Sequence, residues 1–492
     1  MGQWMGEMMQ ANTVNNLLRS DITIRASNGY MHLPEDIANA ENYYRRAIYD
    51  KLGGKTVGKT VFIGPANFYV IRAVIKAAWD LGCNVFNQEG HPAYRVMPEF
   101  KNFYDFIDVI VIFPPLNDLV DSPHSKWVNE WMPEKHVFTP PMIDETIYPE
   151  FHPKLDKPIG PDTIAIKTHT SGTTGFPKII DFTHSRVIEL AEHTIEYNGF
   201  EETDRPLHNK TMHHGSLFVN YAIPLLMLCQ NHYDGDISSF KGRTIEEQLY
   251  NELVYIKNNK ITRWLLPYSY LRDLVNVEPI DLEGKVALNG IVGPFHDQMK
   301  TLFKKFNPKQ IVNMFGSSEM GTMFISKTTP DNINSYNHAR FDIINPHIDY
   351  ELYPDYVKAK WKTSTEWFTM SDKFKVKDGV LWWLGRSNTV VIDGEDIDAV
   401  DLFSFLANKY KSTEFSIVQD FELNRLYLAV FDSEIFTDLA TVNQYIKENY
   451  TKVPWGISQC FSAMNQFEKI DVVVGMKPSA PLLLYYFRNQ GN

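Results

Sequence analysis

The sequence contains little cysteine and no excess of positive charge. Its three cysteines, Cys83, Cys229 and Cys460, lie far apart and form no CxxC pair. This pattern argues against a disulfide framework or a zinc knuckle and fits a reducing compartment. Sixty acidic residues against 48 basic ones give a net charge of −12, a sign that repels phosphate backbones and anionic lipid surfaces. Because no basic stripe interrupts this charge, we expect no nucleic-acid partner.

Long apolar runs are also missing. The longest ones, 222–229 and 481–487, fall well short of the about 18 residues that a membrane span needs. The first ten residues, MGQWMGEMMQ, carry neither a basic stretch before an apolar segment nor a myristoylation signal. We therefore expect a cytoplasmic protein. Its 492 residues, 44% of them hydrophobic, exceed what one core usually supports and predict two or more domains.

Strand-like and helix-like segments alternate over the first 340 residues. The strand-like runs are 60–64, 84–86, 109–113, 163–168, 262–266, 286–291 and 311–314, and the helix-like segments are 41–52, 69–81, 185–197, 268–275 and 296–306. This order predicts an α/β fold, with a large N-terminal domain of mainly parallel sheets covered by helices.

The pattern changes after about residue 340. Strand-like pieces at 367–370 and 380–384 flank a turn at Lys377-Asp378-Gly379. The remaining αβ segment, roughly 388–492, is long enough for a small α+β domain.

Residues 53–60, GGKTVGKT, satisfy the P-loop pattern G-x-x-x-x-G-K-T. A P-loop needs a strand before it and a helix after it. Here a helix-like segment precedes the motif and a strand-like run follows, so the helix dipole would present its wrong end to phosphate. We interpret the motif as a glycine-rich turn that ends a helix, with a P-loop NTPase as the minor alternative.

A second phosphate-type segment, THTSGTTGFPK at 168–178, follows a predicted strand. Its glycines, Gly172 and Gly175, permit close approach of backbone amides to oxygens, and Lys178 adds a compact charge. Hydroxyl donors are supplied by Thr170, Ser171, Thr173 and Thr174. The composition suits a polyphosphate, although a flexible polar surface loop has the same composition.

The order T-S-G-T-T-G-x-P-K at 170–178 resembles the signature of the acyl-adenylate-forming superfamily, which includes acyl-CoA and aryl-CoA ligases, peptide synthetase adenylation domains and luciferases. A second segment, NMFGSSE at 313–319, resembles the family's N-x-Y-G-x-T-E. The resemblance implies that Phe315 stacks on adenine, Asn313 bonds its amino group, Ser318 lies near the α-phosphate and Glu319 holds Mg²⁺.

Weaker resemblances fill the region between and after these motifs. Gly293-Pro294 follows a predicted strand where the family has an adenine-binding segment, and His214 in MHHGS corresponds to the histidine that lines the acyl pocket. WFTMSD at 367–372 resembles W-Y-x-T-G-D, which implies that Asp372 binds the ribose. GRSN at 385–388 resembles G-R-x-D/K, which places Arg386 at the ribose or phosphate and makes Asn388 the hinge. The resemblance thus divides the chain into a large AMP-binding domain, 1–386, and a small mobile domain, 388–492.

The small domain departs from the family at one decisive position. Family members carry a terminal P-x-x-x-x-G-K segment, whose lysine bridges the substrate carboxylate and the α-phosphate. Alignment places Ala480 and Pro481 where that glycine and lysine belong, while Lys477 lies out of register. Adenylation without this lysine is expected to be slower, to recruit Lys477 or Lys469, or to be served by a partner.

The resemblance implies an ATP- and Mg²⁺-dependent ligase that forms an acyl-adenylate from a carboxylic acid and releases pyrophosphate. Transfer to a thiol of CoA or a phosphopantetheine carrier protein is the expected second step. The predicted catalytic residues are Lys178, Thr174, Ser318, Glu319 and His214. His214 stands where amino-acid-activating members have an aspartate, which disfavours an α-amino acid as the substrate. The nearby residues Phe218, Val219 and Tyr221 either suggest an apolar or aromatic acyl group or belong to the core. Two alternatives stay open, a non-catalytic nucleotide-binding scaffold and an amide ligase with an amine acceptor.

Overall fold

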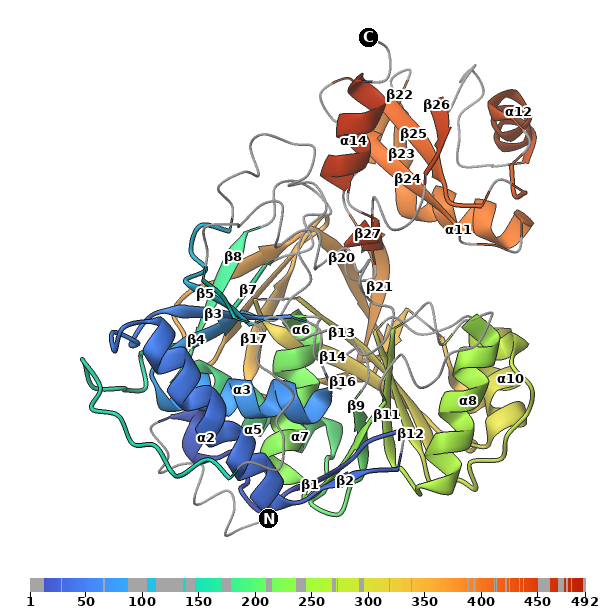
Figure 1. Cartoon of the computed structure of the whole chain (residues 1–492). Coiled ribbons are helices and arrows are strands. Elements are labelled where there is room, and N and C mark those ends of the chain that lie inside the picture. Colours follow the sequence, from blue (N-terminus) through green and yellow to red (C-terminus); the bar gives the residue numbers. More distant parts are fainter. Residues whose placement is uncertain are drawn as a thin grey trace. The chain divides into compact units, whose positions relative to one another are not determined.

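The structure is a computed structural model of the chain. It describes residues 13–27, 29–64, 67–86, 104–111, 136–138, 147–169, 178–208, 215–235, 245–267, 271, 273–291, 296–317, 319–337, 339–386, 389–392, 395–410, 412, 414–420, 423, 425–432, 434–436, 438–449, 461–467, 473–474, 477–478 and 480–489. These residues form two compact units (Figure 1). The first is built from the described parts of Met1–Glu89, Tyr104–His169 and Ile179–His347, and the second mainly from those of Ile348–Asn492. None of the helices in the described ranges is long and apolar enough to cross a membrane.

A six-stranded sheet in the first unit has the order β6-β5-β3-β4-β7-β8. Its first five strands are parallel, and β8 is antiparallel to β7. The strands are β3 (Thr60–Ile63), β4 (Asn84–Phe86), β5 (Val109–Val111), β6 (His136–Phe138), β7 (Ile164–His169) and β8 (Ile179–Thr183). β3, β4 and β5 are buried along their whole length, as is expected of central strands in a parallel sheet.

A second, nine-stranded sheet has the order β16-β14-β13-β12-β11-β9-β10-β1-β2. The six strands from β13 to β1 are parallel, and β14, β16 and β2 add antiparallel edges. The strands are β1 (Thr23–Arg25), β2 (Met31–His32), β9 (Pro206–His208), β10 (Asn231–Asp234), β11 (Arg263–Pro267), β12 (Ala287–Ile291), β13 (Gln310–Ser317), β14 (Gly321–Thr328) and β16 (Ile343–Ile344).

Helices α3 (Phe68–Asp80) and α5 (His184–Asn198) contact both sheets. The Trp79 indole of α3 donates to the carbonyl of Ala165 in β7 at 2.8 Å, and the ring of Phe68 stacks on His208 of β9 with centroids 3.9 Å apart. Tyr197 of α5 donates its hydroxyl to the carbonyl of Met323 in β14 at 3.1 Å. These two helices therefore form a shared layer between the sheets.

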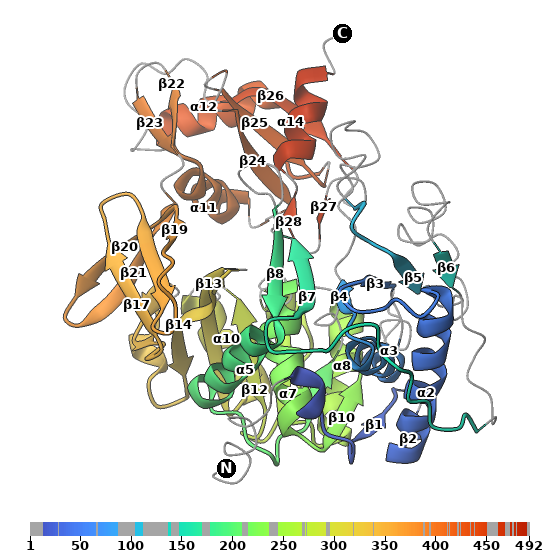
Figure 2. The same ribbon diagram turned by 90° about the vertical axis from the view of Figure 1, so that its left-hand side faces the viewer.

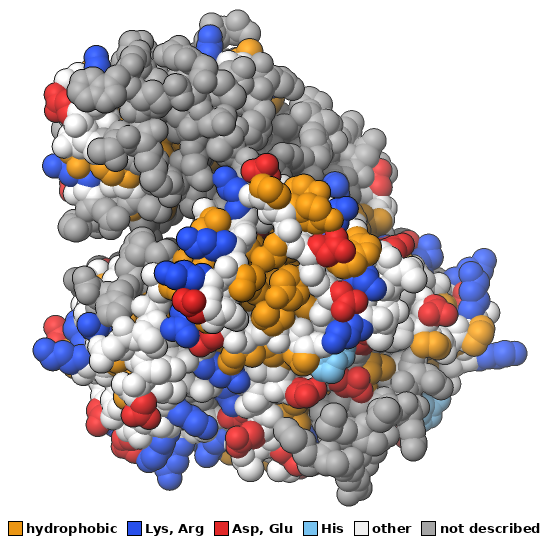
Figure 3. All heavy atoms as spheres, turned by 180° about the vertical axis from the view of Figure 1, so that it is seen from behind, with side chains coloured by type: hydrophobic (Ala, Val, Ile, Leu, Met, Phe, Trp, Pro, Cys, Tyr) orange, Lys and Arg blue, Asp and Glu red, His pale blue; other side chains and the backbone are white. Residues whose placement is uncertain are grey.

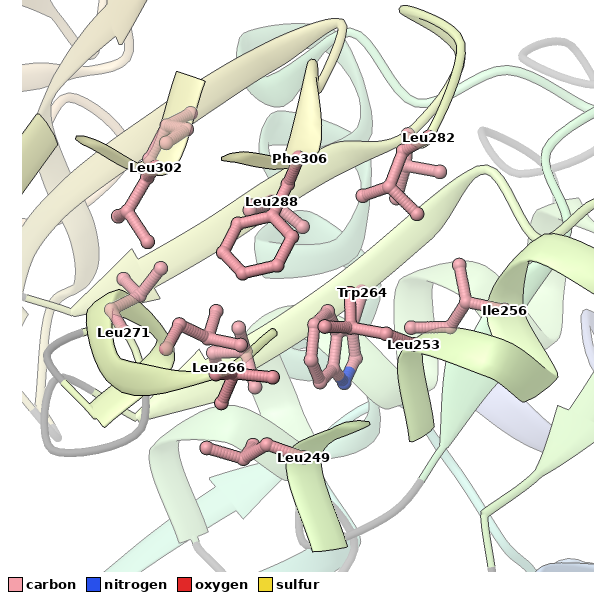
Figure 4. Packing of buried hydrophobic residues seen from close by; sticks show 14 of the residues in the cluster. Leu249, Leu253, Ile256, Trp264, Leu266, Leu271, Leu282, Leu288, Leu302 and Phe306 are labelled. Carbon is pink, nitrogen blue, oxygen red and sulfur yellow. The ribbon is translucent and has the colours of Figure 1, made fainter. Parts of the chain in front are cut away.

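The other face of the nine-stranded sheet carries a hydrophobic core of this unit. Trp264 of β11, Leu288 of β12 and Phe306 of α10 (His296–Phe306) are fully buried in it, and Figure 4 shows their side chains pointing toward one another beside α8 (Ile245–Asn258). Burial of each such side chain contributes about 1.5–3 kcal/mol. This core fixes the strands whose carboxyl ends carry the candidate site.

Three short helical segments run without a break from Gly215 to Leu228. They are α6 (Gly215–Leu217), the π-helical turn η6 (Phe218–Ala222) and α7 (Ile223–Leu228). η6 packs against α5 and β14, and four of its five residues are buried. π-helical turns inside helices are rare and frequently lie at functional sites.

The second unit is mostly antiparallel (Figure 2). It begins with the sheet β17-β18-β19 and the hairpin β20–β21, and continues with a sheet β24-β25-β26 between helices. Its elements are β17 (Ile348–Leu352), β18 (Val357–Trp361), β19 (Phe368–Met370), β20 (Asp372–Lys377), β21 (Val380–Arg386), β22 (Thr389–Ile392), β23 (Glu395–Asp398), α11 (Ala399–Tyr410), β24 (Phe415–Asp420), β25 (Arg425–Val430), α12 (Leu439–Asn449), β26 (Phe461–Gln466), β27 (Val473–Val474), β28 (Lys477–Pro478) and α14 (Ala480–Asn489).

Hydrophobic side chains gather on one face of the molecule, among Lys and Arg side chains (Figure 3). The second unit contributes four of the exposed large hydrophobic residues, Trp367, Val376, Leu384 and Leu423.

The predicted fold class is confirmed: a large unit of mainly parallel sheets covered by helices accompanies a smaller α+β unit. The predicted segments 84–86 and 296–306 agree with β4 and α10 to the residue. The second unit begins at Ile348, whereas the predicted hinge, Asn388, lies outside the described residues, so the boundary at 386–388 stays a prediction.

Two elements of the structure, helix α2 and strand β8, differ from the predicted ones. Helix α2 (Pro34–Lys51) begins seven residues before the predicted 41, because Pro34 occupies its first turn and Asp36 accepts a hydrogen bond from the backbone amide of Leu33 at 2.9 Å. Strand β8 was not predicted. Of the predicted helix 268–275, the described residues 271 and 273 are helical, and the 3₁₀ segment η7 (Leu274–Asn276) follows them directly.

The glycine-rich segment 53–60 is a turn between a helix and a strand, as interpreted from the sequence. Helix α2 ends at Lys51, Gly53, Gly54 and Gly58 all have positive φ angles, and β3 begins at Thr60. The Lys59 ammonium forms an ion pair with Asp108 at 2.9 Å. The P-loop alternative is therefore wrong, since no helix follows the motif.

Candidate active site

The hydroxyl-rich segment joins two antiparallel neighbours, β7 and β8. His169 ends β7 and pairs with Ile179, the first residue of β8, and Lys178 is the exposed residue directly before that strand. Across the same hairpin, Lys167 and Asp181 form an ion pair at 2.7 Å. Lys178 therefore lies directly before a strand, β8, and not at the start of a helix.

Several predicted site residues lie outside the described residues. They are Thr170, Ser171, Gly172, Thr173, Thr174, Gly175, His214, Gly293, Pro294, Ser318 and Asn388. The chain on either side of them is described in each case. His214 precedes α6, and Gly293 and Pro294 follow the carboxyl end of β12.

The second motif forms the hairpin β13–β14. Asn313 lies in mid-strand, is buried, and pairs with Gly290 of β12 and Ser326 of β14. The half-buried ring of Phe315 lies parallel to that of Phe324, with centroids 5.8 Å apart, and edge-on to Phe341 at the same distance. Such an aromatic cluster fixes the plane of Phe315, as a base-stacking residue requires.

Two glycines allow this hairpin to close tightly. A Cβ on Gly316 would lie 1.9 Å from the carbonyl oxygen of Gly321 across the hairpin, and the ladder is irregular between Phe315 and Gly316. Gly321 has a φ of 67°, and a Cβ there would meet Asn220 of η6 at 2.5 Å. The turn holds Glu319, half-buried, between these glycines.

Glu319 is the described residue that could help to hold a magnesium ion. Hard oxygen ligands suit Mg²⁺, which usually takes one or two carboxylates together with phosphate oxygens and waters. No cluster of three or more potential metal ligands occurs among the described residues. A single carboxylate at a strand end therefore fits a metal that arrives with a nucleotide better than a resident metal centre.

Asp372 lies at the start of β20, almost completely buried. Its carboxylate accepts a hydrogen bond from the indole nitrogen of Trp383 at 3.0 Å, and its cross-strand neighbour in β21 is Arg386. The turn Asp378-Gly379, with φ angles of 54° and 75°, sets this register. Sequence reasoning missed Trp383, although counting outward from the Asp-Gly turn would have placed it opposite β20.

The segment that replaces the family's terminal lysine begins helix α14. Ala480 is its first residue and Pro481 its second, a part of the helix where proline is tolerated. Arg488 near its end donates to both carboxylate oxygens of Asp420, at 2.8 and 2.5 Å, and so attaches α14 to β24. Pro481 is therefore part of an anchored helix, and Lys477 lies before it in β28.

Residues 109–348 match the AMP-binding enzyme family. The match places this part of the chain in the AMP-binding superfamily. No curated protein sequence matches it.

Solved structures of similar fold cover almost all of the chain at low identity. A complex of the McyG adenylation and carrier domains with phenylalanyl-adenylate is 15% identical, with a TM-score of 0.72 over 97% of this chain and 83% of that one. ATP-bound MatB from Rhodopseudomonas palustris is 13% identical, with a TM-score of 0.67 over 98% and 100%. The amide bond synthetase McbA from Marinactinospora thermotolerans is also 13% identical, with a TM-score of 0.65 over 98% and 100%.

Proposed function

We propose that the protein is an ATP-dependent carboxylate ligase that forms an acyl-adenylate and releases pyrophosphate. The observation that carries this proposal is the segment 170–178, whose order of hydroxyls, glycines and lysine matches the family signature at every fixed position. The match of residues 109–348 to the AMP-binding enzyme family supports it. Solved structures of similar fold in complex with ATP or an adenylate support it further.

In this proposal the hydroxyl loop and Lys178 bind the β- and γ-phosphates and stabilise the charge that develops on the leaving pyrophosphate. Thr174 and Ser318 donate hydroxyl hydrogen bonds to the phosphates, and Glu319 contributes one carboxylate to Mg²⁺, which supplies charge neutralisation when bound. Phe315 stacks on the adenine, Asn313 and the Gly293-Pro294 segment contact its edge, and Asp372 binds the ribose hydroxyls with Arg386 beside it. His214 lines the acyl pocket.

The second step is transfer of the acyl group to a thiol of CoA or a carrier protein. We assign residues 388–492 to a small domain that turns about Asn388 between the two steps. An amine acceptor is the alternative, and hydroxylamine trapping that does not depend on CoA would favour it.

Pyrophosphate exchange into ATP with pooled carboxylic acids tests the first step. We expect acid-dependent exchange, and we expect Lys178→Ala to lower its rate about 100-fold, the usual cost of removing one group that stabilises transition-state charge. Lys167→Ala is the matched control, since it removes a lysine of the same hairpin whose ion pair with Asp181 contributes about 0–1 kcal/mol.

Absence of exchange with every pool, although ATP still binds, would refute the ligase and favour a nucleotide-binding scaffold. In that case the proline at position 481 would explain the lost turnover. Equal exchange by wild type and Lys178→Ala would refute the assignment of the phosphate loop.

A further inference from the structure

A row of four buried side chains, three of them polar, lies on one face of the nine-stranded sheet. Asp234 pairs with His208 in the register of β10 and β9, and Leu265 pairs with Asn289 in that of β11 and β12. β9 and β11 pair at Leu207 and Trp264, so the next residues, His208 and Leu265, lie side by side. The row thus crosses four neighbouring parallel strands.

The row faces away from the hydrophobic core shown in Figure 4. Leu207, Trp264 and Leu288 belong to that core, and successive side chains of a strand point to opposite faces. His208 and Asn289, each following one of these core residues, therefore face the layer that contains α3 and η6. His208 is the last residue of β9, at the carboxyl end where parallel sheets bind ligands, and Asn289 is the middle residue of β12.

The hydrogen bonds of two histidines fix the protonation of His208. The carbonyl of Cys229 can only accept, so His232 Nε2, 3.0 Å away, carries its proton and His232 Nδ1 is a bare acceptor. His208 Nε2 lies 3.0 Å from that Nδ1 and must donate to it. His208 Nδ1 consequently carries no proton and presents a lone pair as an acceptor. Burial keeps the pKa of His208 well below its ordinary value and lowers the pKa of His232 to about 3.

Buried polar atoms without partners cluster around this row. Within the part of the chain that the structure describes, His208 Nδ1, both polar atoms of the Asn289 amide and the Tyr221 hydroxyl have no hydrogen-bond partner. His208 is 1% exposed and Asn289 is fully buried. The ring of Tyr221, in η6, lies 6.5 Å from that of His208. Buried side chains normally satisfy their polar atoms, so this cluster indicates a ligand that supplies both a donor and an acceptor.

We infer that His208 and Asn289 determine substrate specificity and that the acid this enzyme activates carries a hydroxyl group at the end remote from its carboxylate. The hydroxyl donates its proton to His208 Nδ1 and accepts from the Asn289 amide. No buried cation without an acidic partner lies in the row, which disfavours a second carboxylate. This inference rests on the proposed function, and it adds a remote hydroxyl to the apolar or aromatic acyl group suggested by Phe218, Val219 and Tyr221.

Binding of matched acids tests the inference without requiring turnover. Calorimetric titrations would compare 4-hydroxybenzoate with benzoate, 4-hydroxyphenylacetate with phenylacetate, and 6-hydroxyhexanoate with hexanoate. In at least one pair the hydroxylated acid is expected to bind at least about tenfold more tightly to the wild-type protein. An acid without the hydroxyl leaves the buried polar groups of His208 and Asn289 unpaired.

Two variants and one control separate specificity from folding. Asn289→Leu removes the amide. His208→Gln keeps a donor toward His232 but has no acceptor at the position of Nδ1, because its amide oxygen lies at the far end of the side chain. Both variants should reduce the preference to less than about threefold. Ser326→Ala is the matched control. Ser326 Oγ is also buried without a hydrogen-bond partner. Val312 pairs with Asn289 and therefore shares its face of the sheet. The next residue, Asn313, and its partner Ser326 lie on the opposite face. Thermal melting and ATP titrations would show that each variant is folded.

Equal binding within every pair, binding of no member of any pair, or a preference that survives both variants would overturn the inference. Pyrophosphate exchange measured in parallel separates the two proposals. A hydroxyl preference in binding without pyrophosphate exchange would support the hydroxyl subsite and refute the ligase. Exchange without a hydroxyl preference would support the ligase and refute the hydroxyl subsite.

Discussion

Gly316→Ala offers a direct test of how the second motif is built. The new Cβ would lie 1.9 Å from the carbonyl oxygen of Gly321, 2.8 Å from its carbonyl carbon and 3.1 Å from the Cα of Thr322. All three are backbone atoms, so no rotamer change relieves the contact. The shortest favourable carbon–oxygen contacts are about 3.3 Å, which means that the two strands must separate by roughly 1.4 Å.

Separation of β13 from β14 has a predictable cost. Overpacking of a core costs about 1–3 kcal/mol, and a backbone contact belongs at the upper limit, so we expect a loss of about 3 kcal/mol in the free energy of unfolding. At about 2–4 °C per kcal/mol the Tm falls by roughly 6–12 °C. Because the same turn holds Glu319 and the ring of Phe315, ATP affinity should fall as well.

Thermal melting and ATP titration of Gly316→Ala would measure both effects. Gly160→Ala is the matched control, because a Cβ at Gly160 meets no atom within 4 Å, and it should leave both Tm and affinity unchanged. A Gly316→Ala protein with the Tm and ATP affinity of the wild type would refute the reasoning, since the glycine would then be dispensable for the hairpin.

Two further predictions concern the second unit. Asp372→Ala should weaken ATP binding at least about tenfold if the carboxylate binds the ribose, whereas Trp383→Phe, which removes only the indole donor at 3.0 Å, should weaken it less; equal effects in ATP titrations would argue for a purely structural Asp372. Pro481→Lys should speed pyrophosphate exchange if position 481 replaces the family's lysine, and a folded variant with an unchanged rate would contradict that alignment.

The parallel sheets could be predicted because their strands are short apolar runs followed by helices. Strands β3 and β4 and helix α10 depend on local signals, namely β-branched runs and a 3.6-residue period. β8 could not be predicted in this way: its sequence, IIDFT, leads directly into the helix that begins at His184, and its pairing with β7 depends on a contact across the hydroxyl loop.

The candidate site also contains residues that the sequence could predict and residues that it could not. Motif residues such as Lys178, Phe315 and Asp372 could be named from the sequence, because their spacing within one segment carries the signal. Trp383 is distant from Asp372 in the motif, yet the Asp-Gly turn sets its register and makes it predictable in retrospect.

His208 and Asn289 could not have been found from the sequence, for a physical reason. Each is an isolated polar residue in an apolar strand, and a lone polar residue in such a strand is normally satisfied by a neighbour. Only the register of four parallel strands brings the two into one row, and only the hydrogen bond from His232 to the carbonyl of Cys229 leaves His208 with a bare nitrogen. The motifs therefore report the chemistry common to the superfamily, whereas the features that would distinguish one acid from another arise from tertiary contacts that no single segment encodes.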